Sequence, residues 1–123
     1  DLGYVYIPLT APTASAWGVW RPGDNLFADS LVALDAKTGK RVWHFQTVHH
    51  NLWEWENVGP AMLGDFTVDG RRIKAVMQPT KQSWLYVFDR MTGQPVWPIV
   101  ERPVAKATHT ILAAPSATFL APQ

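Results

Sequence analysis

Short apolar runs alternate with turn residues along the chain, and no segment has the 3.6-residue hydrophobic period of an amphipathic helix. In the second half, residues 64–68 and 72–77 are strand-like runs that flank Asp69-Gly70, a strong hairpin signal. Residues 83–88 form a further apolar and aromatic run that leads into another turn. Residues 62–98 therefore predict four short antiparallel strands in succession.

One hairpin pattern occurs twice. The segment Ala33–Trp43 recurs as Val87–Trp97, with Asp, Thr, Gly, Val and Trp matching at a constant offset of 54 residues. In each copy an apolar run is followed by Asp-x-x-Thr-Gly and by a second run that ends in Trp. We expect Asp to cap the turn through its side chain and Gly to supply the positive φ of a bulged turn. Trp43 and Trp97 are equivalent, which favours a role in packing one repeat against the next.

The first half of the chain has a similar organisation. Residues 3–46 predict three strands, and an insertion at residues 9–28 separates the first strand from the other two. A four-stranded unit that repeats at about 40–55 residues is typical of a β-propeller blade. The predicted fold class is therefore all-β, with about two four-stranded antiparallel blades of a propeller. Two blades alone leave sheet faces and edges uncovered, so we expect the chain to be part of a larger ring.

The domain division follows from these patterns. We expect residues 1–104 to form the partial propeller, divided into a blade with its insertion at 1–60 and a second blade at 61–104. Residues 105–123 are rich in Ala, Pro and Thr and contain no acidic residue and no glycine turn. This composition predicts an irregular tail. The chain starts at Asp1 directly before a strand-like run, which indicates an excerpt from a longer protein.

Composition excludes several classes of function. With 47% hydrophobic and 17% charged residues the chain is globular in character. The formal net charge is +1 and no basic run occurs, so we expect no nucleic-acid partner. Cysteine is absent, which excludes disulfides and thiol-based zinc or redox motifs. Seven Trp indicate large aromatic surfaces that are buried or used for stacking.

The densest chemistry lies in residues 49–57, with the sequence HHNLWEWEN. His49 and His50 suggest a metal site, but adjacent side chains on a strand point to opposite faces and cannot both bind one ion. Structural hydrogen bonding is the favoured role for both histidines. The segment also contains two carboxylates, each directly after a bulky indole, and partial desolvation makes such a carboxylate more basic. Glu54 is therefore a candidate general base, and Glu56 is an alternative because it points to the same face of a strand.

Several motifs resemble those of one known family. The two hairpin copies look like the tryptophan-docking repeat of quinoprotein propellers. Four further segments agree with the pyrroloquinoline-quinone-dependent alcohol and glucose dehydrogenases in order and spacing: Arg21–Leu26, Val42–Gln46, His49-His50 and Gln78–Gln82. The similarity covers about residues 3–104. It implies an eight-bladed propeller that binds pyrroloquinoline quinone near its axis, and this chain would supply about a quarter of it.

The resemblance implies roles for two residues. A carboxylate directly after the Trp of the His-His segment serves in the family as the base that takes the alcohol proton, and Glu54 occupies this position where Asp is usual. A Lys or Arg about 27 residues later reaches the quinone oxygens in the family, and Lys81 has this spacing. The additional methylene of Glu changes its reach by ~1.5 Å. Misplacement on this scale can lower a rate on the order of a hundredfold.

The resemblance also implies a divalent cation, usually calcium, held in part by the Asn of an Asn-Pro step. The matching step here is Ala11-Pro12. Alanine cannot coordinate a metal, so this contact is absent unless Thr10 or Thr13 compensates. We therefore assign no metal-binding residue from the sequence.

The sequence thus favours a fragment of a periplasmic dehydrogenase, with or without membrane association. It would oxidise an alcohol or sugar by base-assisted hydride transfer to the quinone. Its partners would be that substrate and the remaining blades, and the isolated fragment is expected to be inactive. The alternative is a cofactor-free propeller that serves as a scaffold or binding module. Ala11 and the Glu54 variant favour the scaffold, whereas Lys81 at the expected spacing favours the enzyme.

Overall fold

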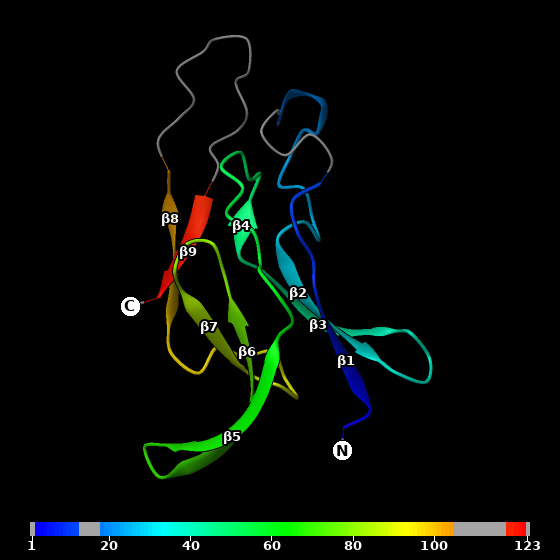
Figure 1. Ribbon diagram of the computed structural model, residues 1–123, viewed down its shortest axis with the longest axis vertical. Helices are drawn as coiled ribbons and strands as arrows, with labels where there is room; N and C mark the ends of the chain where they lie inside the picture. Colours follow the sequence, from blue (N-terminus) through cyan, green and yellow to red (C-terminus); the bar gives the residue numbers. More distant parts are fainter. Residues whose placement is uncertain (1, 13–17, 105–117, 123) are drawn as a thin grey trace.

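The computed structural model describes residues 2–12, 18–104 and 118–122. Its regular structure consists of strands and one short 3₁₀ helix, η1 (Gly18–Trp20). The strands are β1 (Tyr4–Pro8), β2 (Ser30–Asp35), β3 (Arg41–Gln46), β4 (Val48–His49), β5 (Met62–Val68), β6 (Arg71–Pro79), β7 (Leu85–Asp89), β8 (Ile99–Pro103) and β9 (Thr118–Pro122). They form three antiparallel sheets with the orders β1-β2-β3, β5-β6-β7 and β4-β9-β8 (Figure 1). The all-β class is confirmed, and no helix among the described residues is long and apolar enough to cross a membrane.

The repeated hairpin turn forms twice with the same hydrogen bonds. Asp35 Oδ1 accepts the backbone N–H groups of Lys37 and Thr38 at 3.0 and 2.8 Å. In the second copy, Asp89 Oδ1 accepts those of Met91 and Thr92 at 2.9 and 3.0 Å. Glycine follows each Thr, with φ of +68° in the first copy and +76° in the second. The predicted Asp cap and positive-φ Gly are thus confirmed in both copies.

The two copies differ after the turn. Residues Arg41–Gln46 form strand β3, whereas the second copy forms only an isolated bridge between Phe88 and Pro95 and one bond from Val96 N to Val87 O at 2.9 Å. Proline has no N–H to donate to a strand ladder, and a second proline follows at position 98. The fourth strand expected within residues 62–98 is therefore reduced to a bridge, and each sheet of the described structure has three strands.

The core lies where the sheets β1-β2-β3 and β5-β6-β7 meet side by side (Figure 1). Its buried members are Leu31, Ala33, Trp43, Val76, Tyr86 and Phe88. The Trp43 ring packs on Gly93 of the second hairpin, where an added Cβ would lie 2.7 Å from the ring. Trp43 Nε1 and Tyr6 Oη both donate to the carbonyl of Arg90, at 3.2 and 2.8 Å. The predicted packing of one repeat against the next through Trp43 is confirmed.

Among the described residues, no further repeat lies beside the equivalent Trp97. Its ring stacks on Phe66 at a centroid distance of 6.4 Å, and 47% of the residue remains exposed. A large indole left half exposed on a propeller fragment is consistent with a further blade packing there in the complete ring.

The segment expected to be an irregular tail contains a strand. Residues Thr118–Pro122 form β9, which pairs with β8 from Ile99↔Pro122 to Pro103↔Thr118 and with β4 through two further pairs. β8 pairs with no other described strand, so β9 is its one partner. The segment also contains Thr and Phe, which are strand-favouring types. The remainder of the tail, residues 105–117 and 123, lies outside the described residues. The division at residues 60 and 104 stays a prediction.

Candidate functional site

A compact turn carries the candidate base. Asn51 is 1% exposed, and its Oδ1 accepts the N–H groups of Trp53 at 3.0 Å and Trp55 at 3.3 Å. Asparagine commonly binds backbone groups a few residues ahead in this way. Glu54 lies between the two indoles with φ of +54°, and its side chain is exposed. The expectation that Glu54 and Glu56 share one face of an extended strand is therefore wrong, because the chain turns at Glu54.

Lys81 lies against Glu56. Its Nζ is 2.7 Å from Glu56 Oε2, and its backbone N–H donates to the Glu56 carbonyl at 3.0 Å. A bridge between Asn57 and Thr80 continues this pairing of the two segments. The hydrogen bond to Glu56 raises the pKa of Lys81, and the charges of Glu56, Glu54 and Asp29 act in the same direction. The structure thus brings Lys81 and both candidate carboxylates to one site.

The two indoles beside Glu54 stack on each other. The Trp53 and Trp55 ring centroids are 5.1 Å apart with an interplanar angle of 25°. Trp53 remains 37% exposed, so part of its surface is open to a ligand. Together with Lys81, which is 43% exposed at its side chain, the turn presents an aromatic surface, a carboxylate and an ammonium group.

Behind this turn lies a buried carboxylate that sequence reasoning missed. Asp29 is 0% exposed, and neither of its oxygens has a hydrogen-bond partner of ordinary geometry within the described part of the chain. Burial raises the pKa of Asp29 to about 6, and the charge of Glu56 also raises it, whereas Asn51, Arg21 and Lys81 lower it. The sequence carries little signal for this burial, because Asp is mostly exposed in folded proteins and residue 29 lies two positions before the apolar run Leu31–Leu34.

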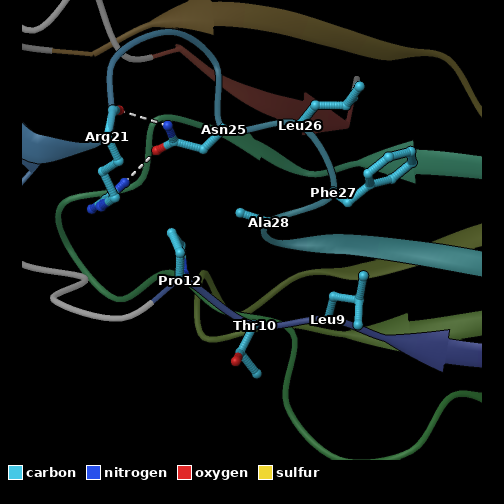
Figure 2. A pocket seen from close by; sticks show the side chains of 8 residues that line it. All are labelled: Leu9, Thr10, Pro12, Arg21, Asn25, Leu26, Phe27 and Ala28. Carbon is cyan, nitrogen blue, oxygen red and sulfur yellow. Dashed lines mark hydrogen bonds between the residues drawn. The ribbon is translucent and has the colours of Figure 1, made fainter.

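The insertion supplies Arg21, which holds the same turn. Its guanidinium donates to the Asn51 carbonyl at 2.6 Å and to Asn25 Oδ1, and Asn25 Nδ2 donates back to the Arg21 carbonyl at 2.7 Å. Burial lowers the pKa of Arg21. Figure 2 shows this pair at one side of a mainly apolar pocket of about 440 Å³. The pocket is lined by Leu9, Thr10, Pro12, Arg21, Asn25, Leu26, Phe27 and Ala28.

The two histidines contact different elements. His50 is 2% exposed, and its Nδ1 forms a 2.7 Å hydrogen bond with the Gly23 carbonyl. His49 Nε2 lies 3.3 Å from Glu101 Oε1 on β8. The two rings thus contact different elements, which favours the predicted structural role of His49 and His50.

The described residues do not form a complete cation site. No group of three His, Cys, Asp or Glu side chains among them could hold a metal ion. The Ala11 side chain has no atom that can coordinate a metal. Thr13, one of the two residues that could supply a ligand in its place, lies outside the described residues. The buried Asp29 carboxylate is accompanied by the positive charges of Arg21 and Lys81, which disfavour a further cation. We therefore assign no chemical step to a metal.

Comparisons with known proteins agree on one family. The family model described as "Glucose/ethanol/alcohol dehydrogenase, beta-propeller domain", named PQQ, matches residues 1–117. The quinoprotein glucose dehydrogenase of Escherichia coli (strain K12) is 39% identical over 104 residues, which are 84% of this chain and 13% of that protein. The glycerol dehydrogenase large subunit of Gluconobacter oxydans (strain 621H) is 38% identical over 104 residues, 83% of this chain and 14% of that protein.

Solved structures show the same relationship. The quinohemoprotein alcohol dehydrogenase of Comamonas testosteroni superposes with a TM-score of 0.71 at 30% sequence identity, over 78% of this chain and 15% of that one. The chain thus spans about one seventh of the length of these relatives. The hairpin repeat, the tryptophan packing and the sequence matches agree, and the chain belongs to the pyrroloquinoline-quinone-dependent dehydrogenases as a fragment of their β-propeller.

Proposed function

We propose that this chain is the part of a quinone-dependent dehydrogenase that carries the catalytic base, and that the complete protein oxidises an alcohol or sugar. The observation that carries the proposal is the pairing of the Lys81 segment with the segment that contains Glu54. Lys81 N donates to the Glu56 carbonyl at 3.0 Å and Lys81 Nζ lies 2.7 Å from Glu56 Oε2, two residues after Glu54. Glu54 and Lys81 are exposed, so both are accessible to a substrate or cofactor. By family relationship we also propose a periplasmic location.

Each residue has a defined chemical task in this proposal. The Glu54 carboxylate takes the proton of the substrate hydroxyl, and the carbon that carries the hydroxyl loses a hydride and becomes a carbonyl carbon. Pyrroloquinoline quinone, when bound, would supply the acceptor for that hydride. Lys81 has three N–H donors and uses one toward Glu56, so the other two would be available to hold the quinone oxygens. Glu56 orients the Lys81 ammonium group, and the Trp53 ring forms one side of the site.

The scaffold alternative rests on two features of the sequence. Ala11 has no side-chain oxygen that could bind a metal, and residue 54 is Glu where Asp is usual. This alternative is tested by the same experiment as the enzyme. The full-length protein is incubated with pyrroloquinoline quinone and Ca²⁺, passed through gel filtration, and assayed for retained quinone absorbance and for alcohol- or sugar-driven dye reduction. Retained quinone and dye reduction support the enzyme, whereas loss of the quinone with and without Ca²⁺ overturns it in favour of the scaffold.

The base is tested by Glu54→Gln, which preserves size and removes the proton acceptor. We expect kcat to fall by about 10²–10⁴-fold with quinone retention unchanged. Glu101→Gln is the matched control, because Glu101 is a half-exposed carboxylate that pairs with His49 away from the turn. A larger loss of kcat in Glu56→Gln than in Glu54→Gln would transfer the role of the base to Glu56.

A further inference from the structure

The turn that carries Glu54 depends on one amide side chain. Asn51 Oδ1 is committed to two backbone N–H groups, those of Trp53 and Trp55. The Nδ2 group of the same amide must therefore point away from the turn. It is buried and has no hydrogen-bond partner of ordinary geometry within the described ranges. Asn51 thus has an unused donor on its buried side.

The group that faces this donor is the Asp29 carboxylate. Asp29 is fully buried, its oxygens are unused acceptors, and interaction with the Asn51 side chain lowers the pKa of its carboxyl against the larger effect of burial. Its backbone is firmly held, because Thr47 N and Oγ1 both donate to the Asp29 carbonyl, at 2.8 and 2.7 Å. Asp29 N also donates to the Thr10 carbonyl at 3.2 Å. The carboxylate is therefore a fixed support at the start of β2.

The other charged groups around Asp29 are Arg21, Lys81 and Glu56. Arg21 donates to the backbone carbonyl of Asn51 at 2.6 Å, so it holds the main chain of the residue whose side chain faces Asp29. Arg21 of the insertion thus holds the backbone of Asn51, and Asp29 of the blade faces its side-chain amide.

We propose that Asp29 is a positioning residue, whose buried carboxylate orients the Asn51 amide and thereby holds Glu54 in its left-handed turn at the candidate site. This inference rests on the proposed function of Glu54 as the base. Asp29 itself touches neither substrate nor cofactor. Its action passes through Asn51, whose Oδ1 can bind both N–H groups only when Nδ2 is directed toward Asp29.

The proposal predicts a charge-swap rescue. Asn51→Asp keeps the acceptor for Trp53 N and Trp55 N, but it places a second carboxylate against Asp29 inside the protein, where like charges repel strongly. Adding Asp29→Asn to this variant again places one carboxylate against one amide. The carboxylate is then at residue 51 and the amide at residue 29. An interaction of this kind appears in a double-mutant cycle as a strong departure from additivity.

The test uses the full-length protein loaded with pyrroloquinoline quinone. We expect Asn51→Asp to lower kcat at least about tenfold, through misplacement of Glu54, while KM and quinone retention stay near those of the parent protein. The double variant should recover most of this loss, whereas Asp29→Asn alone has a smaller effect because a neutral amide oxygen still accepts from Asn51. Asp65→Asn, which removes an exposed ion pair with Arg90, is the control and should leave kcat unchanged. A double variant no better than Asn51→Asp overturns the proposal.

Thermal unfolding of the same variants without quinone separates the two proposals. Asn51→Asp should lower the unfolding midpoint, and the double variant should recover it. Recovery of the midpoint in a protein that never retains quinone overturns the dehydrogenase proposal and supports the Asp29–Asn51 pair. Dye reduction in the parent protein, without any rescue in the double variant, overturns the positioning role and leaves the dehydrogenase proposal supported.

Discussion

At the scale of single residues, the site contains a buried carboxylate, Asp29, whose charge lowers the stability of the folded state. Asp29 has a pKa of about 6 in place of its ordinary 3.8, because burial disfavours the charged form. A carboxyl group whose folded pKa is raised binds its proton more tightly in the folded state, so stability is lost as pH rises from the unfolded pKa through the folded one. Above about pH 6 the loss amounts to roughly 3 kcal/mol. A group of this kind is typical of functional sites, where stability is exchanged for a defined geometry.

This shift predicts a pH-dependent effect of Asp29→Asn. We expect the variant to have a higher unfolding midpoint than the parent protein at pH 7.5, and the difference to disappear near pH 4, where Asp29 is protonated in the folded state. Thermal unfolding of both full-length proteins across this range measures it. A difference that is the same at both pH values would show that the Asp29 charge is not the cause.

Lys81 gives a second prediction at the residue scale. Lys81→Ala removes the ammonium that we expect to face the quinone oxygens, so quinone retention should fall and kcat should drop on the order of a hundredfold. Lys81→Arg should recover only part of both, because its planar guanidinium is a fork and not a compact point charge. Lys37→Ala, in the exposed turn of the first hairpin, is the matched control. Normal quinone retention in Lys81→Ala would contradict the proposed contact.

At the scale of elements, the two hairpins are alike in conformation and different in surroundings. Gly39 and Gly93 have φ of +68° and +76°, so alanine is strained at both positions. A Cβ at residue 39 meets no atom within 4 Å, whereas a Cβ at residue 93 lies 2.7 Å from the Trp43 ring. Gly39 is needed for its turn alone. Gly93 is needed for its turn and also for the contact between the repeats.

These surroundings predict unequal costs for the same substitution. Gly39→Ala should lower the free energy of unfolding by about 1 kcal/mol, the usual cost of a left-handed non-glycine residue. Gly93→Ala should add a further 1–3 kcal/mol or so, because the Trp43 ring must move away. Denaturant unfolding of the two variants provides the comparison. Equal losses would mean that the Trp43 ring moves at little cost.

At the scale of the whole molecule, the chain forms part of a larger fold. It spans about one seventh of the length of its relatives, and Trp97 at its far repeat remains half exposed. In the proposed function, the exposed site that contains Glu54 and Lys81 would need opposing groups from other blades to enclose a cofactor.

We therefore predict that the isolated 123-residue chain neither retains pyrroloquinoline quinone in gel filtration nor reduces dye with an alcohol or sugar. The full-length protein under the same conditions is the control. Dye reduction by the isolated chain would show that these residues alone form the reactive site, and it would contradict the need for the remaining blades.

The sequence by itself determined the features that rest on local interactions. An Asp cap, a positive-φ Gly and alternating strands act within a few residues, so both hairpins, the repeat and the family were predictable. Pro95 also signalled the loss of a strand, although the prediction of four strands did not use it. Glu54 and Lys81 could be named as candidates because their segments resemble the family's motifs, and their roles stay predictions.

Only the tertiary structure decided how the site is arranged. It placed Glu56 against Lys81, turned the chain at Glu54, and buried Asp29 behind Asn51. The burial of Asp29 behind Asn51 and the contact of Glu56 with Lys81 depend on segments that lie 22 and 25 residues apart. The turn at Glu54 is held locally by Asn51, but its place beside Lys81 depends on the same long-range pairing. Burial and charge pairing arise only when such segments meet, so the pattern of residue types along the chain does not contain them.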